Sequence, residues 1–369
     1  MRPDFCSKTR ENEMKSGPLT GLRVLELAGI GPGPLACMIL ADLGADVIRV
    51  ERRGAESEPS DQTLRGRRII SADLKDPAEL NSVLDLVTDA DVLIEGYRPR
   101  VAERLGLGPE QCLARNPRLV YGRMTGWGQT GSLASSAGHD INYISITGVL
   151  ENIGRADDRP VPPLNMIGDY GGGAMFLIAG VLAALFERQT SGRGQTVDAA
   201  MCDGTAVLAQ LMWSMRGTNE WSDRRGSNLL DGSQPYYDTY VCADGRCMAV
   251  GCIEPEFFAL TVKLLGLDPC ALPDQQDHTR RDELREAFAA VFRTRTMAEW
   301  SEIFLGTDAC VTPVLTYAEA LENQHFRDRA TFTSIDGVDQ PRPAPRFSRT
   351  PWSEPIRAQR IEGAAWLPI

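Results

Sequence analysis

An alternation of strand-like and helix-like segments near the start of the chain is the feature that most constrains its fold. An apolar run at residues 22–27 leads through a loop of glycine and proline to a helical segment at 35–43, and a second apolar run follows at 46–50. This order predicts a β-strand, a helix and a second β-strand. Strands that are apolar throughout are typical of a parallel sheet covered on both faces. We therefore expect an α/β fold with a Rossmann-like parallel sheet.

The same pattern continues to about Arg216. Asp76-Pro77 supplies a capping side chain and a proline at the first helical position for a helix that ends near Val87. Three glycines at 171–173 open an apolar helix that ends near Glu187. The other elements expected here are strands at 91–95, 118–124 and 195–199 and a helix that ends near Arg216.

The composition changes after a segment rich in charged residues, glycine and serine. Strands expected at 236–242 and 247–252 flank Asp244-Gly245, a strong hairpin signal. Helical patterns at 256–265, 280–292 and 297–305 and an apolar run at 309–314 follow. We expect an N-terminal extension at 1–16, a large α/β domain at 17–218 completed by 325–369, a linker at 219–235 and a smaller α+β domain at 236–324.

The overall composition is that of a globular protein without an obvious polyanionic partner. The chain has 39 basic and 50 acidic residues, a net charge of −11, which argues against a nucleic-acid-binding protein. The apolar stretch at 174–186 is shorter than the roughly 20 residues that cross a bilayer, so we expect a buried helix and no membrane association. Nine cysteines show neither a CxxC pair nor metal-ligand spacing, so we expect no metal site, no structural disulfide and a cytoplasmic location.

Two glycine-rich segments each present one group that can transfer a proton. His139 lies in the segment 138–143 and Asp169 in the segment 168–173. A histidine titrates near neutrality and a carboxylate can be tuned by its surroundings, so the two groups could remove and return a proton at one carbon. Each also has a structural interpretation: a hydrogen-bonded histidine for His139 and a helix N-cap for Asp169. The residues alone leave both interpretations open.

Glu254 stands between an expected strand and an expected helix. A glutamate at that place is most often an anion at a helix N-terminus. Near His139 it would instead orient the imidazole and hold its proton.

The segment 29–34 superficially imitates a dinucleotide-binding loop. It lies between a strand and a helix and is followed by Glu51, but a proline stands at 34, where the third glycine of GxGxxG would fall. We therefore expect a tight turn and no nicotinamide cofactor.

Arginines concentrate in one part of this acidic chain and suggest a phosphate site. Several of them are expected to follow strand ends, where α/β sheets bind ligands, although a solvated surface is the alternative. The residues are Arg49, Arg52, Arg53, Arg65, Arg67 and Arg68, with Lys75, Arg98, Arg100 and Arg104 further on.

Taken together, these motifs resemble those of the alpha-methylacyl-CoA racemases, within the family III CoA-transferase superfamily. The resemblance covers about residues 17–350, and its motifs lie at 25–34, 72–75, 138–143, 231–232, 250–255 and 308–314. It implies that His139 and Asp169 form the acid/base pair and that Glu254 assists from the partner subunit. It further implies an interlocked homodimer whose active sites lie between the large domain of one chain and the small domain of the other.

The resemblance also implies a CoA site in the large domain, with arginines on the phosphates. The residues expected there are Arg52, Arg65, Ala72, Asp73, Leu74, Lys75, Glu95, Arg98, Arg104, Gly138, Asp140, Asn142 and Tyr143. CoA would enter as part of an acyl-CoA substrate, so no separate cofactor is expected.

These implications lead to one expected activity and two alternatives. We expect a racemase that inverts the α-carbon of 2-methyl-branched acyl-CoA thioesters through an enolate, with His139 and Asp169 on opposite faces. The first alternative is a CoA transferase in which Asp169 attacks the thioester and carries the acyl group as an anhydride. The second is a catalytically silent CoA-binding or dimer-scaffold protein.

Overall fold

The computed structural model of the chain describes residues 16–55, 57–58 and 60–367. It divides the chain into two compact units. The first contains the described residues through Tyr143, the segment Asn165–Val207 and the described residues from Ala330; the second contains Ile144–Leu164 and Leu208–Arg329. The expected extension at 1–16 lies outside the described residues except for Ser16.

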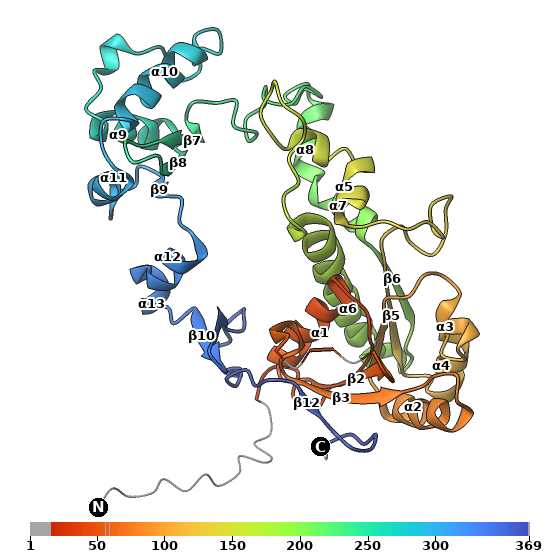
Figure 1. Ribbon diagram of the computed structural model, residues 1–369. Coiled ribbons are helices and arrows are strands. Elements are labelled where there is room, and N and C mark those ends of the chain that lie inside the picture. The colour runs from red at the N-terminus through yellow and green to blue at the C-terminus, as the bar shows by residue number, and fades with distance from the viewer. Residues whose placement is uncertain (1–15, 56, 59, 368–369) are drawn as a thin grey trace, which may run out of the picture. The chain divides into compact units, whose positions relative to one another are not determined.

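The first unit is built on a seven-stranded sheet in which every pairing is parallel, which confirms the predicted α/β fold (Figure 1). Its order is β12-β3-β2-β1-β4-β5-β6. The strands are β1 (Arg23–Leu27), β2 (Asp46–Arg52), β3 (Arg67–Ala72), β4 (Val92–Glu95), β5 (Val120–Thr125), β6 (Thr196–Ala200) and β12 (Gln359–Arg360). The order reverses between β1 and β4, and ligands of open α/β sheets bind beyond the carboxyl ends of such strands.

Helices cover both faces of this sheet because its strands are apolar on both faces. Val24, Val47 and Val92 face one core together with α1 (Pro32–Asp42) and α6 (Phe176–Ser191). Leu25 and Ile48, the next residues along β1 and β2, face the opposite core with α2 (Pro77–Asp89). The other helices of this unit are α3 (Val101–Arg104), α4 (Pro109–Arg115), α5 (Asp140–Ile146, which extends into the second unit) and α7 (Met201–Leu208).

Two helical predictions need correction. The apolar helix expected to open at 171–173 begins earlier, as a π-helical segment η3 (Met166–Met175) that continues into α6. The helix expected to end near Arg216 is two helices, α7 and α8 (Gln210–Gly217), interrupted at Ala209. The N-cap of α2 is confirmed, since the side chain of Asp76 accepts from the amides of Ala78 and Glu79 at 2.9 and 3.0 Å.

The continuous helical run Met166–Ser191 is long and apolar enough, by length and composition alone, to cross a membrane. In the structure this run packs on the sheet: Leu177 and Val181 are fully buried in the core that α6 shares with β4 and β5. This packing is that of a core helix of an α/β domain, although only 44% of the apolar window in the run is buried.

The second unit contains an antiparallel sheet in the order β7-β8-β9. The predicted hairpin is confirmed: β7 (Tyr237–Val241) pairs with β8 (Cys247–Gly251), and Gly245 in the turn has φ +77°. Helices α9 (Pro255–Leu264), α10 (Arg281–Phe292) and α11 (Met297–Phe304) and the strand β9 (Val311–Pro313) complete its core. The remaining helices are α12 (Tyr317–Glu322) and α13 (Gln324–Asp328), and a hairpin of β10 (Phe332–Ile335) and β11 (Val338–Pro341) belongs to the first unit.

The segment 219–235 is packed within the second unit. Trp221 is buried and its indole N–H donates to Asn152 Oδ1 at 3.1 Å, and Asn228 and Ser233 are buried as well. The residues 144–164, 208–218 and 325–329 cluster with this unit, whereas the sequence analysis assigned them to the large domain.

Candidate active site

The loop after β1 lies at the point where the strand order reverses. Gly31 has φ +70° and precedes Pro32, the first residue of α1, so the loop makes the tight turn that the sequence predicts. Glu51, which would contact the ribose in a dinucleotide-binding fold, is 1% exposed and paired with Arg49 and Arg360. Its carboxylate is therefore committed to the protein interior.

The carboxylate of Asp169 faces this loop. A Cβ placed on Gly31 would lie 3.1 Å from Asp169 Oδ2, and the amide of Asn165 donates to the same oxygen at 3.3 Å. Asp169 lies inside the first turn of η3 and Asn165 is the residue that precedes the helix, so the N-cap interpretation of Asp169 is wrong. A π-helical turn in this position is a common feature of functional sites.

Glycines allow η3 to pack closely against α7. A Cβ on Gly172 would come within 2.5 Å of Thr205 Oγ1, and a Cβ on Gly204 would come within 1.9 Å of the carbonyl oxygen of Gly172. Larger side chains at either position would force the two helices apart. The glycines that follow Asp169 therefore have a packing role in addition to their proximity to the carboxylate.

The environment of Asp169 favours its protonated form. Burial raises the pKa of Asp169, the negative charge of Asp140 raises it further, and the Asn165 amide and the charge of His139 act in the opposite direction. A raised carboxyl pKa is the property that a general acid or base needs to work nearer to neutral pH.

His139 is connected to Asp169 through the intervening residue Asp140. Asp140 is 7% exposed, and its Oδ2 accepts the backbone N–H of Asp169 at 2.7 Å. His139 itself is exposed, and its own N–H donates to Asn142 Oδ1 at 3.1 Å. The segments that carry His139 and Asp169 are therefore joined by one hydrogen bond.

Tyr143 supports the segment that carries His139. Its hydroxyl donates to the carbonyl of Gly138, and its ring packs edge-on against Trp127 with centroids 4.7 Å apart. Tyr143 is only 8% exposed, and burial raises the pKa of its hydroxyl. The Tyr143 hydroxyl and one oxygen of the Asp140 carboxylate are therefore engaged with the protein, and direct contact of these two residues with CoA stays a prediction.

Two further residues expected at the CoA site are buried. The guanidinium of Arg65 donates to both carboxylate oxygens of Asp42, at 3.0 and 2.6 Å, and is 3% exposed. Glu95 is fully buried, accepts from Arg123 Nε at 2.9 Å and from the N–H of Tyr97 at 2.7 Å, and burial raises its pKa. Both side chains are engaged in buried ion pairs, and the assignment of Arg65 and Glu95 to CoA binding stays a prediction.

The arginine-rich segment is also less exposed than expected. Arg49 and Arg67 lie within β2 and β3, not after strand ends, and both pair with the buried Glu26. Arg68 pairs with Asp46. These arginines neutralise carboxylates inside the sheet and are not part of a phosphate site.

Exposed cationic side chains nevertheless lie beyond the carboxyl ends of the sheet strands. Arg52 is the last residue of β2, Lys75 follows β3, Arg98 follows β4 and Arg104 ends α3, and all four are exposed. Ala72 is buried at the end of β3, Leu74 is half-buried, and the side chain of Asp73 accepts the N–H of Lys75 at 3.0 Å. This edge can present several positive charges to phosphate groups.

Glu254 belongs to the second unit, where it is exposed and precedes the first turn of α9. Glu254 is the N-cap residue of α9, which agrees with the expected anion at a helix N-terminus, although its side chain makes no hydrogen bond to the helix. Its charge acts on the nearby Cys310, where burial and Glu254 together raise the thiol pKa.

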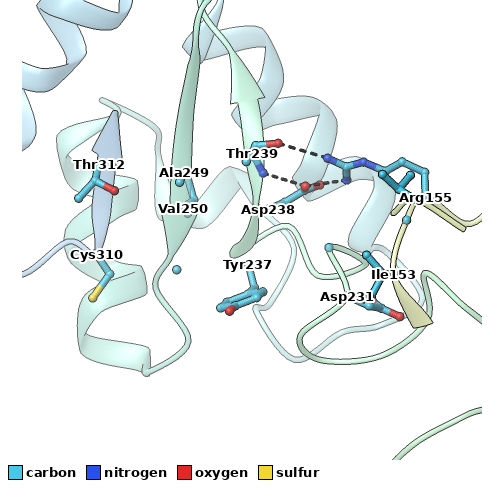
Figure 2. A pocket seen from close by; sticks show the side chains of 14 residues that line it. Ile153, Arg155, Asp231, Tyr237, Asp238, Thr239, Ala249, Val250, Cys310 and Thr312 are labelled. Atoms are coloured by element: carbon cyan, nitrogen blue, oxygen red, sulfur yellow. Dashed lines mark hydrogen bonds and ion pairs between the residues drawn. The ribbon is translucent and has the colours of Figure 1, made fainter. Parts of the chain in front are cut away.

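A cavity of about 620 Å³ lies in the second unit beside the sheet β7-β8-β9 (Figure 2). Tyr237, Thr239 and Cys310 line it, and at one end Arg155 contacts Asp238 at 2.6 Å and Thr239 at 3.2 Å. The motifs at 231–232, 250–255 and 308–314 each contribute residues to its wall. No ligand was expected at these motifs, because their proximity depends on the antiparallel pairing of the strands.

Within the described part of the chain, no group of three or more histidine, cysteine, aspartate or glutamate side chains is placed to hold a metal ion. The eight described cysteines are free thiols.

Comparison with known proteins agrees with these features. Residues 19–360 match the model of CoA-transferase family III. The chain is 49% identical over 334 residues to the alpha-methylacyl-CoA racemase of Mus musculus and 46% identical to that of Homo sapiens, in each case over 90% of this chain and 87% of the relative. It is 29% identical to the acetyl-CoA:oxalate CoA-transferase of Acetobacter aceti, over 88% of each.

A solved structure supports the same conclusion. The CAIB/BAIF family protein from Brucella suis superposes with a TM-score of 0.80 and 27% identity, over 94% of this chain and 97% of that one. The parallel sheet, the antiparallel second unit and the match along nearly the whole sequence establish that the chain belongs to CoA-transferase family III.

Proposed function

We propose that this protein inverts the α-carbon of 2-methyl-branched acyl-CoA thioesters by 1,1-proton transfer. The main observation in support is the link between the segments of His139 and Asp169: the backbone N–H of Asp169 donates a hydrogen bond to Asp140, the residue after His139. The names of the mouse and human relatives, at 49% and 46% identity, support the same activity.

The reaction uses the acidity that a thioester gives to its α-hydrogen. One of the pair, neutral His139 or anionic Asp169, takes the proton, and an enolate forms. The other group delivers a proton to the opposite face of the same carbon, so the configuration is inverted and no atom is gained or lost. The burial that raises the pKa of Asp169 brings its carboxyl nearer to the proton affinity of an imidazole, so that either group can act as base or acid.

The CoA part of the substrate supplies binding energy away from the reacting carbon. Arg52, Lys75, Arg98 and Arg104 are exposed beyond the strand ends and are the cations we assign to its phosphates. Binding at these groups would position the α-carbon for proton transfer. The proposed chemistry uses neither a metal nor a nicotinamide or flavin cofactor.

We further propose that the active form is a homodimer in which Glu254 of the partner subunit completes the site. An exposed glutamate whose side chain makes no hydrogen bond to its own helix is available for such a role. Several large apolar side chains on α7 and α8 of the isolated chain are also exposed, and subunit association would bury surfaces of this kind. They are Val207, Leu208, Leu211 and Trp213.

The test is incubation of one enantiomer of a 2-methylacyl-CoA in deuterated water. With the wild-type chain we expect deuterium at the α-carbon and loss of optical purity. With His139→Ala or Asp169→Asn we expect neither α-deuteration nor a change in optical purity. His325→Ala and Asp89→Asn, at exposed positions on α13 and α2, are matched controls that should retain activity. Full activity of His139→Ala or Asp169→Asn would remove that residue from the mechanism.

A CoA transferase is the second candidate, because Asp169 offers a carboxylate and a family member at 29% identity is named as a transferase. In that case acyl transfer to an added carboxylic acid would occur without α-deuteration. Hydroxylamine would trap an anhydride on Asp169 as a hydroxamate.

A further inference from the structure

Asp140 is a buried carboxylate whose position calls for an explanation. It is 7% exposed, it opens α5 directly after His139, and its Oδ2 accepts the N–H of Asp169 at 2.7 Å. Its other oxygen, Oδ1, is buried without a hydrogen-bond partner in the part of the chain that the structure describes. A partly unsatisfied buried carboxylate costs folding free energy, so an ordinary packing role does not account for it.

The hydrogen bond links two segments that are far apart in sequence. Asp140 is joined to His139 by a peptide bond and to the backbone of Asp169 by a single charge-assisted hydrogen bond. Two further hydrogen bonds fix the segment around His139. The hydroxyl of Tyr143 donates to the carbonyl of Gly138, and the N–H of His139 donates to Asn142 Oδ1. The path from one base to the other therefore contains one non-covalent contact, and that contact depends on Asp140.

We propose that Asp140 is a positioning residue that fixes the spacing between His139 and Asp169 for transfer of a proton across one carbon. This inference rests on the proposed function. Two bases on opposite faces of a carbon must each reach hydrogen-bonding distance of it, so a small error in their separation costs activity. In this role the Asp140 side chain acts through its hydrogen bond to the Asp169 amide.

The same carboxylate affects the electrostatics of the site. The charged groups that act on Asp169 are Asp140 and His139, and the titratable hydroxyl of Tyr143 also interacts with its carboxylate. Asn165 contributes a neutral donor, and Gly31, before α1, contributes no charge. The negative charge of Asp140 raises the pKa of Asp169, in the same direction as the larger effect of burial. Removing the charge while keeping the side-chain shape should therefore lower the pKa of Asp169.

Two substitutions separate geometry from charge. Asp140→Ala leaves the Asp169 amide without its acceptor, and we expect kcat to fall by roughly tenfold to a hundredfold. Asp140→Asn keeps an oxygen that can accept this N–H, so it should recover most of kcat. In the pH profile of kcat/KM, the acid limb of Asp140→Asn should move to lower pH, because the pKa of Asp169 is then lower and its carboxylate stays deprotonated to a lower pH. Asp89→Asn, an exposed carboxylate on α2, is the matched control and should change neither quantity.

The outcomes decide the proposal. Loss of kcat in Asp140→Ala with recovery and a displaced acid limb in Asp140→Asn supports it. Wild-type kcat in Asp140→Ala, or an unchanged profile in Asp140→Asn, overturns it. If Asp140→Ala does not fold, Asp140→Asn alone still tests the pH profile.

A measurement without substrate separates this inference from the proposed function. Amide hydrogen exchange at Asp169, followed by mass spectrometry of a peptide that contains it, should be protected in the wild-type chain. It should become faster by roughly tenfold to a hundredfold in Asp140→Ala, because a hydrogen bond to a charged acceptor is lost. Equal exchange in both chains overturns the positioning role. A wild-type chain that never exchanges the α-hydrogen of its substrate refutes only the proposed function.

Discussion

The ring of Tyr143 lies against Gly126 so closely that a Cβ on Gly126 would fall 2.0 Å from the ring atom Cε1. The same tyrosine donates its hydroxyl to the carbonyl of Gly138, directly before His139. The absence of a side chain at Gly126, after β5, thus determines where the histidine-bearing segment lies.

Replacing Gly126 with alanine should displace Tyr143 and with it the segment of His139. We expect the free energy of unfolding to fall by about 1–3 kcal/mol, the usual cost of overpacking, and proton exchange at the substrate to decrease. Urea unfolding and α-deuteration measure the two effects. Gly217→Ala, in open space at the end of α8, is the control and should be neutral or slightly stabilising. A Gly126→Ala chain as stable and active as the wild type would contradict this account.

Asn165 should influence the pH dependence of activity through Asp169. Its amide donates to Asp169 Oδ2 and so lowers a pKa that burial has raised. Asn165→Ala removes the donor, raises the pKa of Asp169 and moves the acid limb of kcat/KM to higher pH, because the carboxylate is then protonated over a wider range. The measurement is the pH profile for the enantiomer that needs anionic Asp169. Asn81→Ala, exposed on α2, should leave the limb in place.

Substitution of Arg65 should reduce the stability of the protein, whereas substitution of Arg98 should reduce its affinity for CoA. Arg65→Met removes the buried ion pair with Asp42 and should reduce the free energy of unfolding by about 3–5 kcal/mol. Arg98 is exposed, so Arg98→Met should alter stability by no more than about 0.5 kcal/mol but weaken CoA binding.

Urea unfolding and calorimetric titration with CoA distinguish the two arginines. The double variant Asp42→Leu with Arg65→Met should regain part of the stability lost in Arg65→Met, because the carboxylate that lost its ion pair with Arg65 is then also removed. Weaker CoA binding by fully folded Arg65→Met would support the assignment of Arg65 to the CoA site.

The contact between Arg246 and Glu319 should be visible in a carboxyl titration. Hydrogen bonds from Arg246, and then from Thr316, lower the pKa of Glu319 to about 2. A lowered folded-state pKa contributes stability that is complete above the unfolded pKa of about 4.3 and is lost as the pH falls toward 2. In Arg246→Gln, nuclear magnetic resonance of the Glu319 carboxyl should report a higher pKa. Arg293→Gln, exposed after α10, should leave it unchanged.

Several elements of the first unit could be predicted because their apolar residues indicate burial and their capping residues act locally. The runs that became β1, β2 and β4 are apolar on both faces, and Asp76-Pro77 begins α2 with side chains that act locally. β3 was not predicted, because Arg67 and Arg68 make its sequence look exposed. Arg67 is buried there only because Glu26, on another strand, neutralises it.

The helical start at Met166 was missed for a related reason. Glycines disfavour a helix in isolation, but here they allow η3 to approach α7, and that packing outweighs their low propensity. The buried positions of Arg65 and Glu95 were likewise beyond sequence reasoning, since their partners Asp42 and Arg123 are distant in the chain.

The α/β class, the hairpin and the candidates His139 and Asp169 follow from the amino-acid sequence, because burial patterns, turn residues and titratable groups are local properties. The link that Asp140 makes between the segments of these two residues, and the exposure of each arginine, depend on how distant segments pack. Hydrogen bonds and ion pairs between distant segments form only when the strands are in register, so no local pattern could specify them.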